Sequence, residues 1–139
     1  MRNWDGQFIQ ALAFNLGASS VLVAEATAMR NGIKVAVQSG FTNIQIENDN
    51  SILIQPVQGH IETPWKIHVL LQDIHCYSQS CNCVIVQHTF REGNRAANWL
   101  AKLGLTLKST VVWHQISNTA FHCILIEDNL GLTLERRTT

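Results

Sequence analysis

The sequence predicts an α/β fold in which a mixed sheet is flanked by helices. Segments with the two-residue alternation of strands take turns along the chain with segments whose apolar residues recur at helical spacing. Strands that are separated by helices favour parallel pairing in one sheet. The chain has 139 residues, of which 46% are hydrophobic, and this suits one domain with a single core.

The first predicted elements are a strand and a long helix. Residues 7–14 are typical of a strand that follows a turn at Asp5-Gly6. From about residue 20 to residue 39 the apolar side chains recur every three to four positions. A serine at position 19 or 20 can cap this helix, and Gly40 can end it.

Five further elements follow along the chain. They are a strand at 43–47, a short helix near 52–57, a helix from Pro64 to about residue 77, a buried strand at 83–89 and a helix at about 95–103. Proline suits the first turn of a helix, β-branched residues suit a buried strand, and Gly104 can end the last helix. This order of elements predicts parallel neighbours in the sheet.

We expect a domain over residues 1–107 and a C-terminal extension over residues 108–139. The strand and helix patterns loosen in the extension, where a small hairpin or strand is expected within 126–131. No run of about 18 apolar residues occurs, and no apolar run follows a basic start. The sequence therefore predicts no membrane span, no secretion and an intracellular location.

The charge of the chain is balanced, with ten Lys and Arg against ten Asp and Glu. A general nucleic-acid-binding protein neutralises many phosphates and carries a broad basic surface. The balanced charge argues against such a surface, so any contact with nucleic acid is expected to be local.

Three of the four cysteines lie close together in the sequence. Cys76, Cys81 and Cys83 have His75 and His88 nearby, which invites a zinc site. The spacing lacks the paired C-x2-C motifs of structural zinc sites, and this favours reduced, half-buried thiols.

Glu25 is an acidic residue on the apolar face of the first predicted helix. A projection at 100° per residue puts it in the middle of that face, among Val21, Leu22, Ala28, Met29, Gly32 and Ala36. An ionised carboxylate in that position needs a cation, a donor network or a water-filled cleft. The structural alternative is a side chain that reaches the rim of the helix or bonds to backbone amides.

Asp49 follows the predicted strand 43–47 and precedes a helix. Open α/β sheets bind ligands at this end of their strands. The structural alternative is that Asp49 caps the helix, a role for which Asn50 and Ser51 also qualify. Together, Glu25 and Asp49 predict an acidic cleft that can hold a hard divalent cation through oxygen ligands.

Four short motifs occur in a specific order between residues 2 and 104. They are Ala24-Glu25-Ala26, then Glu47-Asn-Asp49-Asn-Ser51, then Pro64-Trp65, and finally His88-Thr-Phe-Arg91-Glu-Gly-Asn94-Arg-Ala-Ala-Asn98-Trp-Leu-Ala101. This succession resembles the plant reverse-transcriptase-like branch of the RNase H family.

The resemblance implies an RNase H-like fold with a sheet ordered 3-2-1-4-5, and cleavage of the RNA strand of RNA–DNA hybrids. Members of that family use two Mg²⁺ ions, which are held by four carboxylates. The ions stabilise the negative charge on the attacking and leaving oxygens. By resemblance, Glu25 is the helix glutamate and Asp49 the aspartate after the fourth strand. His88 matches a histidine that assists proton transfer or product release, although a satisfied strand histidine is the structural alternative for it.

Two departures from the family pattern change the expected activity. The fourth carboxylate position is Asn98, a neutral amide. The family's first strand, which is central in the sheet and carries the first metal-binding aspartate, is missing from this chain. Only Glu25 and Asp49 remain of four carboxylates, so the sequence predicts weak Mg²⁺ binding and impaired hydrolysis.

These observations leave open whether the chain is an enzyme. The first hypothesis is a weakened RNase H-type nuclease, with Arg91, Asn94 and Arg95 as nucleic-acid contacts. The second is a non-catalytic module that binds hybrid or duplex nucleic acid by its backbone shape. The third is a protein-interaction module, whose open sheet edge accepts a partner strand or forms a dimer.

Overall fold

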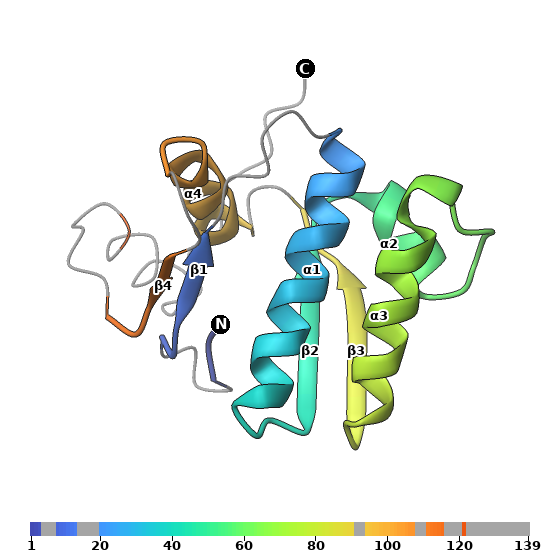
Figure 1. Cartoon of the computed structure of the whole chain (residues 1–139), viewed down its shortest axis with the longest axis horizontal. Helices are drawn as coiled ribbons and strands as arrows, with labels where there is room; N and C mark the ends of the chain where they lie inside the picture. Colours follow the sequence, from blue (N-terminus) through green and yellow to red (C-terminus); the bar gives the residue numbers. More distant parts are fainter. Residues whose placement is uncertain (4–7, 14–19, 91–93, 108–110, 116–120, 122–139) are drawn as a thin grey trace. The chain divides into compact units, whose positions relative to one another are not determined.

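The computed structural model of the chain describes residues 1–3, 8–13, 20–90, 94–107, 111–115 and 121 (Figure 1). The chain divides into two compact units. The central unit is Leu16–Thr89, and the terminal unit combines Met1–Asn15 with Phe90–Thr139. In order, the described elements are β1 (Ala11–Ala13), α1 (Val21–Gln38), β2 (Asn43–Asn48), α2 (Ser51–Val57), the 3-10 helix η1 (Trp65–Ile67), α3 (His68–Gln79), β3 (Cys83–His88), α4 (Arg95–Gly104) and β4 (Val111–Trp113).

The sheet of the central unit consists, among the described residues, of β2 and β3. The two strands are parallel and pair in register from Asn43 with Cys83 to Asn48 with His88. Because parallel strands need a crossover connection, the chain passes through α2, η1 and α3 between them. The predicted parallel neighbours are confirmed, and the carboxyl ends of β2 and β3 lie side by side.

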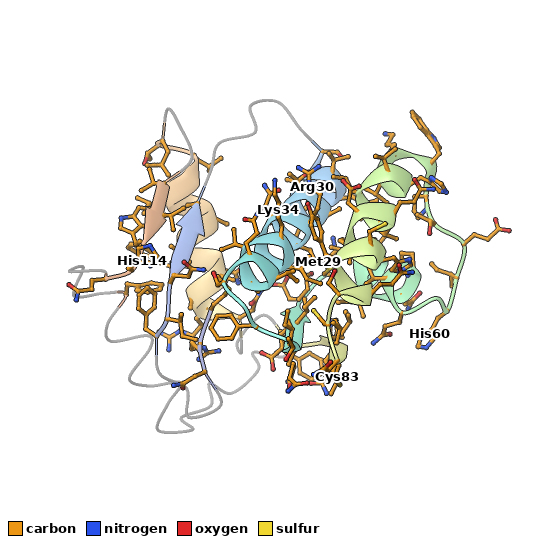
Figure 2. The ribbon with its side chains drawn as sticks, turned by 60° about the horizontal axis from the view of Figure 1, so that its bottom comes forward. Met29, Arg30, Lys34, His60, Cys83 and His114 are labelled. Carbon is orange, nitrogen blue, oxygen red and sulfur yellow. The ribbon has the colours of Figure 1, made fainter. Side chains whose placement is uncertain are left out.

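One face of this strand pair packs against helices. Figure 1 shows α1 and α3 in front of β2 and β3, and the core lies between these layers. The buried members of the core come from α1, α2, η1 and α3: Ala26, Met29, Ile33, Leu53, Ile54, Val57, Ile67, Leu71 and Ile74. Ile44, Ile46, Val84 and Val86 of the strands pack against them. On α1, Met29 belongs to this core, whereas Lys34 is exposed (Figure 2).

The strand predicted at residues 83–89 is present as β3, but the prediction that it is buried is wrong. Cys83, Ile85 and Gln87 are exposed, while the alternate residues Val84 and Val86 face the core. The β-branched composition gives a strand, as expected. It does not give burial on both sides, because the helices of the central unit cover only one face of the pair.

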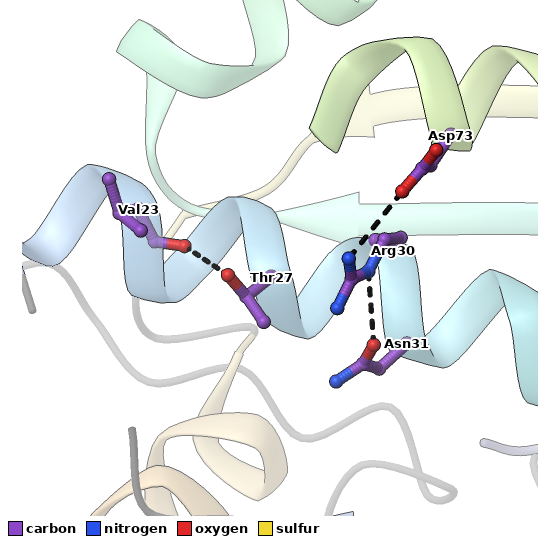
Figure 3. A network of polar contacts seen from close by, with 5 residues as sticks. All are labelled: Val23, Thr27, Arg30, Asn31 and Asp73. Carbon is purple, nitrogen blue, oxygen red and sulfur yellow. Dashed lines mark hydrogen bonds and ion pairs between the residues drawn. The ribbon is translucent and has the colours of Figure 1, made fainter. Parts of the chain in front are cut away.

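The helix α1 begins and ends where the sequence predicts. Ser20 is the N-cap, and its Oγ accepts a hydrogen bond from Val23 N at 3.3 Å. Gly40 has a φ of +88°, a left-handed conformation that favours glycine, directly after the helix. Midway along α1, Arg30 pairs with Asp73 of α3 at 3.5 Å (Figure 3).

The third predicted helix has two parts. Pro64 precedes the helical residues instead of being the first of them, because its ψ of 136° is extended. The chain then makes a 3-10 turn, in which Ile67 N donates to Pro64 O at 3.1 Å, before α3 begins at His68.

The terminal unit contains a second, antiparallel strand pair. Ala11–Ala13 of β1 pair with Val111–Trp113 of β4, and an antiparallel bridge joins Arg2 to Phe8 across the expected turn, which itself lies outside the described residues. The core of this unit is built on Ala11 and Phe121. Phe8, Ala96, Trp99, Leu100 and Trp113 pack against them.

β4 lies beyond the predicted domain boundary at residue 107. It pairs with β1, so these residues of the expected extension pack with the N-terminal part of the chain. The boundary itself stays a prediction, and the strand expected within 126–131 lies outside the described residues. Within the described part of the chain, no helix has both the length and the apolar character needed to cross a bilayer.

Candidate functional site

The carboxyl ends of β2 and β3 carry a cluster of polar side chains. Glu25 comes from the second turn of α1, Asn48 is the last residue of β2, and Asp49 follows directly. Asn48 Nδ2 donates a hydrogen bond to Glu25 Oε2 at 2.8 Å, which joins the helix to the end of the strand. We call Glu25, Asn48 and Asp49 the acidic site.

The turn after β2 is fixed by two asparagines on either side of Asp49. Asn48 Oδ1 accepts a hydrogen bond from Asn50 N at 2.7 Å, which is an Asx turn. Asn50 Oδ1 in turn accepts from Ile52 N at 3.0 Å and caps α2. The cap is therefore Asn50 and not Asp49, whose carboxylate forms no hydrogen bond or ion pair with the described residues.

The expectation that Glu25 lies in the middle of the buried face of α1 is wrong. The buried residues of α1 are Ala26, Thr27, Met29, Ile33 and Ala36, whereas Val21 and Ala28 of the projected set are exposed. Glu25 lies at the edge of the buried stripe and is half-buried. The projection misplaces it because apolar character alone does not tell which part of a broad apolar face the neighbouring elements cover.

The surroundings of Glu25 favour its protonated form. Partial burial raises the pKa of its carboxyl group above the ordinary value, the hydrogen bond from Asn48 opposes this, and the negative charge of Asp49 raises the pKa further. The influence of Asp49 places the two carboxylates within electrostatic range of each other. Two neighbouring carboxylates that repel each other are a site that a cation can stabilise.

His88 ends β3 at the same edge of the sheet. Its backbone pairs with Asn48, and its ring Nε2 lies 3.2 Å from Asp49 O. The imidazole therefore contacts the backbone of the turn that carries Asp49. The predicted site residues Glu25, Asp49 and His88 thus belong to one edge of the central unit.

The remaining predicted residues belong to the terminal unit or fall outside the described residues. Asn98 is a half-buried residue of α4, Asn94 is the residue before that helix and Arg95 is its first residue. Arg91 lies outside the described residues. Their roles as metal and nucleic-acid contacts stay predictions.

The oxygen donors of the acidic site suit a hard divalent cation such as Mg²⁺. Two ionised carboxylates balance the charge of one divalent ion. They balance only half of the charge of two such ions. Among the described residues, no group of three or more His, Cys, Asp and Glu side chains is placed to hold a metal ion, and this includes the described cysteines. Glu25 and Asp49 thus offer the type of ligand that such an ion prefers, and their role as metal ligands stays a prediction.

Sequence reasoning missed Asn48, the residue that joins Glu25 to the turn. The signal was the pattern Asn48-Asp49-Asn50 between a strand and a helix. Asparagine side chains in such positions readily bond to the backbone two residues on, which predicts an Asx turn. The bond to Glu25 spans 23 positions and has no local signal.

Comparison with solved structures shows that the chain has an RNase H-like fold. The RNase H1 of the archaeon Halobacterium salinarum matches with a TM-score of 0.62 at 20% identity, over 66% of this chain and 70% of that one. The N-terminal RNase H domain of a Mycobacterium tuberculosis protein, solved as a fusion with maltose binding protein, matches with a TM-score of 0.58 at 19% identity. That match covers 60% of this chain and 61% of that one.

The chain belongs to the reverse transcriptase-like family, whose model matches residues 1–104. A curated relative is a putative ribonuclease H protein of Arabidopsis thaliana, 25% identical over 137 residues. The alignment covers 99% of this chain and 22% of the relative, so the chain spans about a fifth of that protein's length. The chain is thus an RNase H-like, nucleic-acid-related domain.

Proposed function

We propose that this domain binds RNA–DNA hybrid or duplex nucleic acid, and that its acidic site gives at most slow, metal-dependent hydrolysis. The observation that carries the proposal is the position of Glu25 and Asp49 at the carboxyl ends of a parallel strand pair. Ligands of open α/β sheets bind at this edge. Family membership supports nucleic acid as the ligand.

Glu25 and Asp49 would hold one divalent cation, preferably Mg²⁺. When bound, such an ion supplies positive charge to phosphate oxygens on which negative charge develops. Glu25 is also hydrogen-bonded to Asn48, and the fourth family carboxylate is replaced by Asn98. The reduced negative charge supports a low affinity for cations and therefore slow turnover.

Binding of the duplex itself would depend on a small number of phosphate contacts. We propose Arg91, Asn94 and Arg95 for this role, because they precede or begin α4 and two of them are cationic. The neutral charge of the chain supports a short footprint. Each phosphate contact that is lost reduces the salt dependence of binding by about one unit of the logarithmic slope.

The test uses a labelled RNA–DNA hybrid with the protein in chelator and then in excess Mg²⁺. We expect salt-dependent binding in chelator, and slow or undetectable cleavage after Mg²⁺ is added. Glu25→Gln and Asp49→Asn should abolish any cleavage that is observed and leave binding in chelator unchanged. Glu47→Gln is the matched control, because Glu47 is an exposed carboxylate of β2, the strand that Asp49 follows.

Three results would decide against the proposal or parts of it. Absence of hybrid binding at low salt would exclude the nucleic-acid role. Cleavage that persists in Glu25→Gln would assign it to another site or to a contaminant. Rapid cleavage that Glu25→Gln abolishes would show that two carboxylates suffice, and impaired activity would be wrong.

A second candidate function is pairing with a strand from a partner or a second copy. It is favoured by β2, which among the described residues of the central unit pairs with β3 alone. An unpaired strand edge presents backbone donors and acceptors that another strand can use. Light scattering of the purified chain tests it: a dimer that dissociates when proline replaces Gln45 in β2 supports pairing, and a monomer at all concentrations excludes self-pairing.

A further inference from the structure

Asn48 forms hydrogen bonds with both polar atoms of its amide group, one to the Glu25 carboxylate and one to the backbone of the turn that carries Asp49. The nitrogen donates to Glu25 Oε2 at 2.8 Å. The oxygen accepts from Asn50 N at 2.7 Å and so closes the turn that carries Asp49. Asn48 is therefore bonded on both sides, to a residue 23 positions earlier and to one two positions later.

We propose that Asn48 is the positioning residue of the acidic site, which orients the Glu25 carboxylate and shapes the turn that presents Asp49. The inference rests on the proposed function, because a positioning role has meaning only if the two carboxylates bind a cation. Its grounds are the two hydrogen bonds and the register of β2, which ends at Asn48 and brings it to the carboxyl edge.

The chemistry of the amide explains why asparagine suits this position. It offers a donor and an acceptor at the same time, whereas an aspartate in the charged state offers acceptors only. Aspartate at position 48 could close the turn but would repel Glu25. Serine could also close the turn through its hydroxyl group, but it is one atom shorter and does not carry the amide donor.

The hydrogen bond to Oε2 fixes the rotation of the Glu25 carboxyl group. The second oxygen, Oε1, accepts no hydrogen bond from the described residues, so it is the one left for a cation. Partners that orient metal ligands in this way affect metal affinity by about 10–100-fold when they are replaced. We expect the same range for Asn48.

The first test measures binding of Mn²⁺ alone by magnetic resonance, with thermal unfolding as the control for folding. Asn48→Ser should lower the Mn²⁺ affinity about 10-fold or more and preserve the melting temperature, since the hydroxyl can still close the turn. Asn43→Ser is the matched control, because Asn43 is exposed at the other end of β2, and it should bind Mn²⁺ like the parent chain.

The second test does not depend on a cation or on a variant at position 48. In the ¹⁵N–¹H spectrum, the side-chain amide signal of Asn48 should shift when Glu25→Gln removes the charged acceptor. It should not shift in Glu47→Gln, which removes an exposed carboxylate on the same strand.

The outcomes separate the inference from the proposed function. If the parent chain binds no Mn²⁺, the cation site of the proposed function fails. If the parent binds Mn²⁺ and Asn48→Ser binds it within twofold, Asn48 has no positioning role although the site stands. An Asn48 amide signal that is indifferent to Glu25→Gln would also overturn the inference.

Discussion

The two ends of the parallel strand pair both have backbone hydrogen bonds, but only the carboxyl end adds side-chain bonds to them. At the amino end, Asn82 N and Cys83 N both donate to Thr42 O, at 2.8 and 3.1 Å, so backbone groups alone close the gap between the strands. At the carboxyl end, Thr89 N donates to Asn48 O at 2.9 Å, and side chains add further connections: Asn48 Nδ2 donates to Glu25, and the His88 ring contacts Asp49 O.

The difference shows where this fold can accommodate chemistry. Backbone bonds can be made by almost any sequence, whereas the side-chain bonds at the carboxyl end require particular residues. The carboxyl end is also where the N-terminal half of α1 and the start of α2 approach the strands. It therefore gathers two carboxylates, while the residues at the amino end, Thr42, Asn43, Asn82 and Cys83, are neutral and exposed.

The largest expected effect on stability comes from a substitution in the core, at a residue of α2 close to the carboxyl end of the strand pair. Leu53 of α2 is completely buried and directly follows Ile52, whose N–H donates to the Asn50 cap. Leu53→Ala should lower the free energy of unfolding by about 2–5 kcal/mol, because it leaves a cavity in the core. Urea unfolding measures this, and Ile52→Ala is the control, since Ile52 is 62% exposed. Equal losses in the two variants would contradict the assigned core.

A smaller effect is expected from the cap that follows the acidic site. Asn50→Ala removes the hydrogen bond to Ile52 N and should cost about 1 kcal/mol. Asn82→Ala at the amino end should cost less, because Thr42 O is bonded there by backbone N–H groups that the substitution keeps. Chemical denaturation of both variants compares the two ends directly. A larger loss of stability in Asn82→Ala than in Asn50→Ala would contradict this, because stability would then depend more on the side chain at the amino end.

The ion pair between α1 and α3 is expected to contribute less again. Arg30 and Asp73 are 3.5 Å apart, and their side chains are 32% and 43% exposed. Asp73→Asn should cost about 0.2–1 kcal/mol at low salt and almost nothing at high salt. It should leave Mn²⁺ binding unchanged. A change in Mn²⁺ affinity would show that the acidic site depends on the packing of α1 well beyond Glu25.

The smallest expected effect is a pH-dependent change of stability from Glu25. Because its folded pKa is raised, its contribution to stability is fully present below the ordinary pKa of a glutamate and is lost as the pH rises through the raised pKa. Glu25→Gln cannot ionise, so it should melt slightly higher than the parent at pH 7. The difference should shrink towards pH 4. Thermal unfolding at both pH values tests this, and an equal gain in Glu47→Gln would contradict it.

The arrangement of elements could be predicted because it depends on local patterns. Alternating apolar residues predicted β2, and a serine cap together with Gly40 predicted both ends of α1. The alternation of strands and helices along the chain predicted the parallel pairing of β2 and β3. The chain order of elements and the spacing of motifs carry enough information for that level of the structure.

The details that could not be predicted depend on contacts between distant residues. β4 pairs with β1 across about a hundred positions, and three residues are too few to show a strand pattern. The location of Glu25 at the edge of the buried stripe depends on which elements cover α1. The bond from Asn48 to Glu25 depends on the register of β2 with its neighbours, which no local pattern contains.

The Asx turn and the cap of α2 form one continuous chain of hydrogen bonds that starts at Glu25. It passes through the side chain of Asn48 to the backbone N–H of Asn50, and through the side chain of Asn50 to the N–H of Ile52. Hydrogen–deuterium exchange at these two amides should therefore report on an ion or phosphate that binds several residues away. The exchange rates of these two amides would therefore follow the occupancy of the acidic site without a measurement of cleavage.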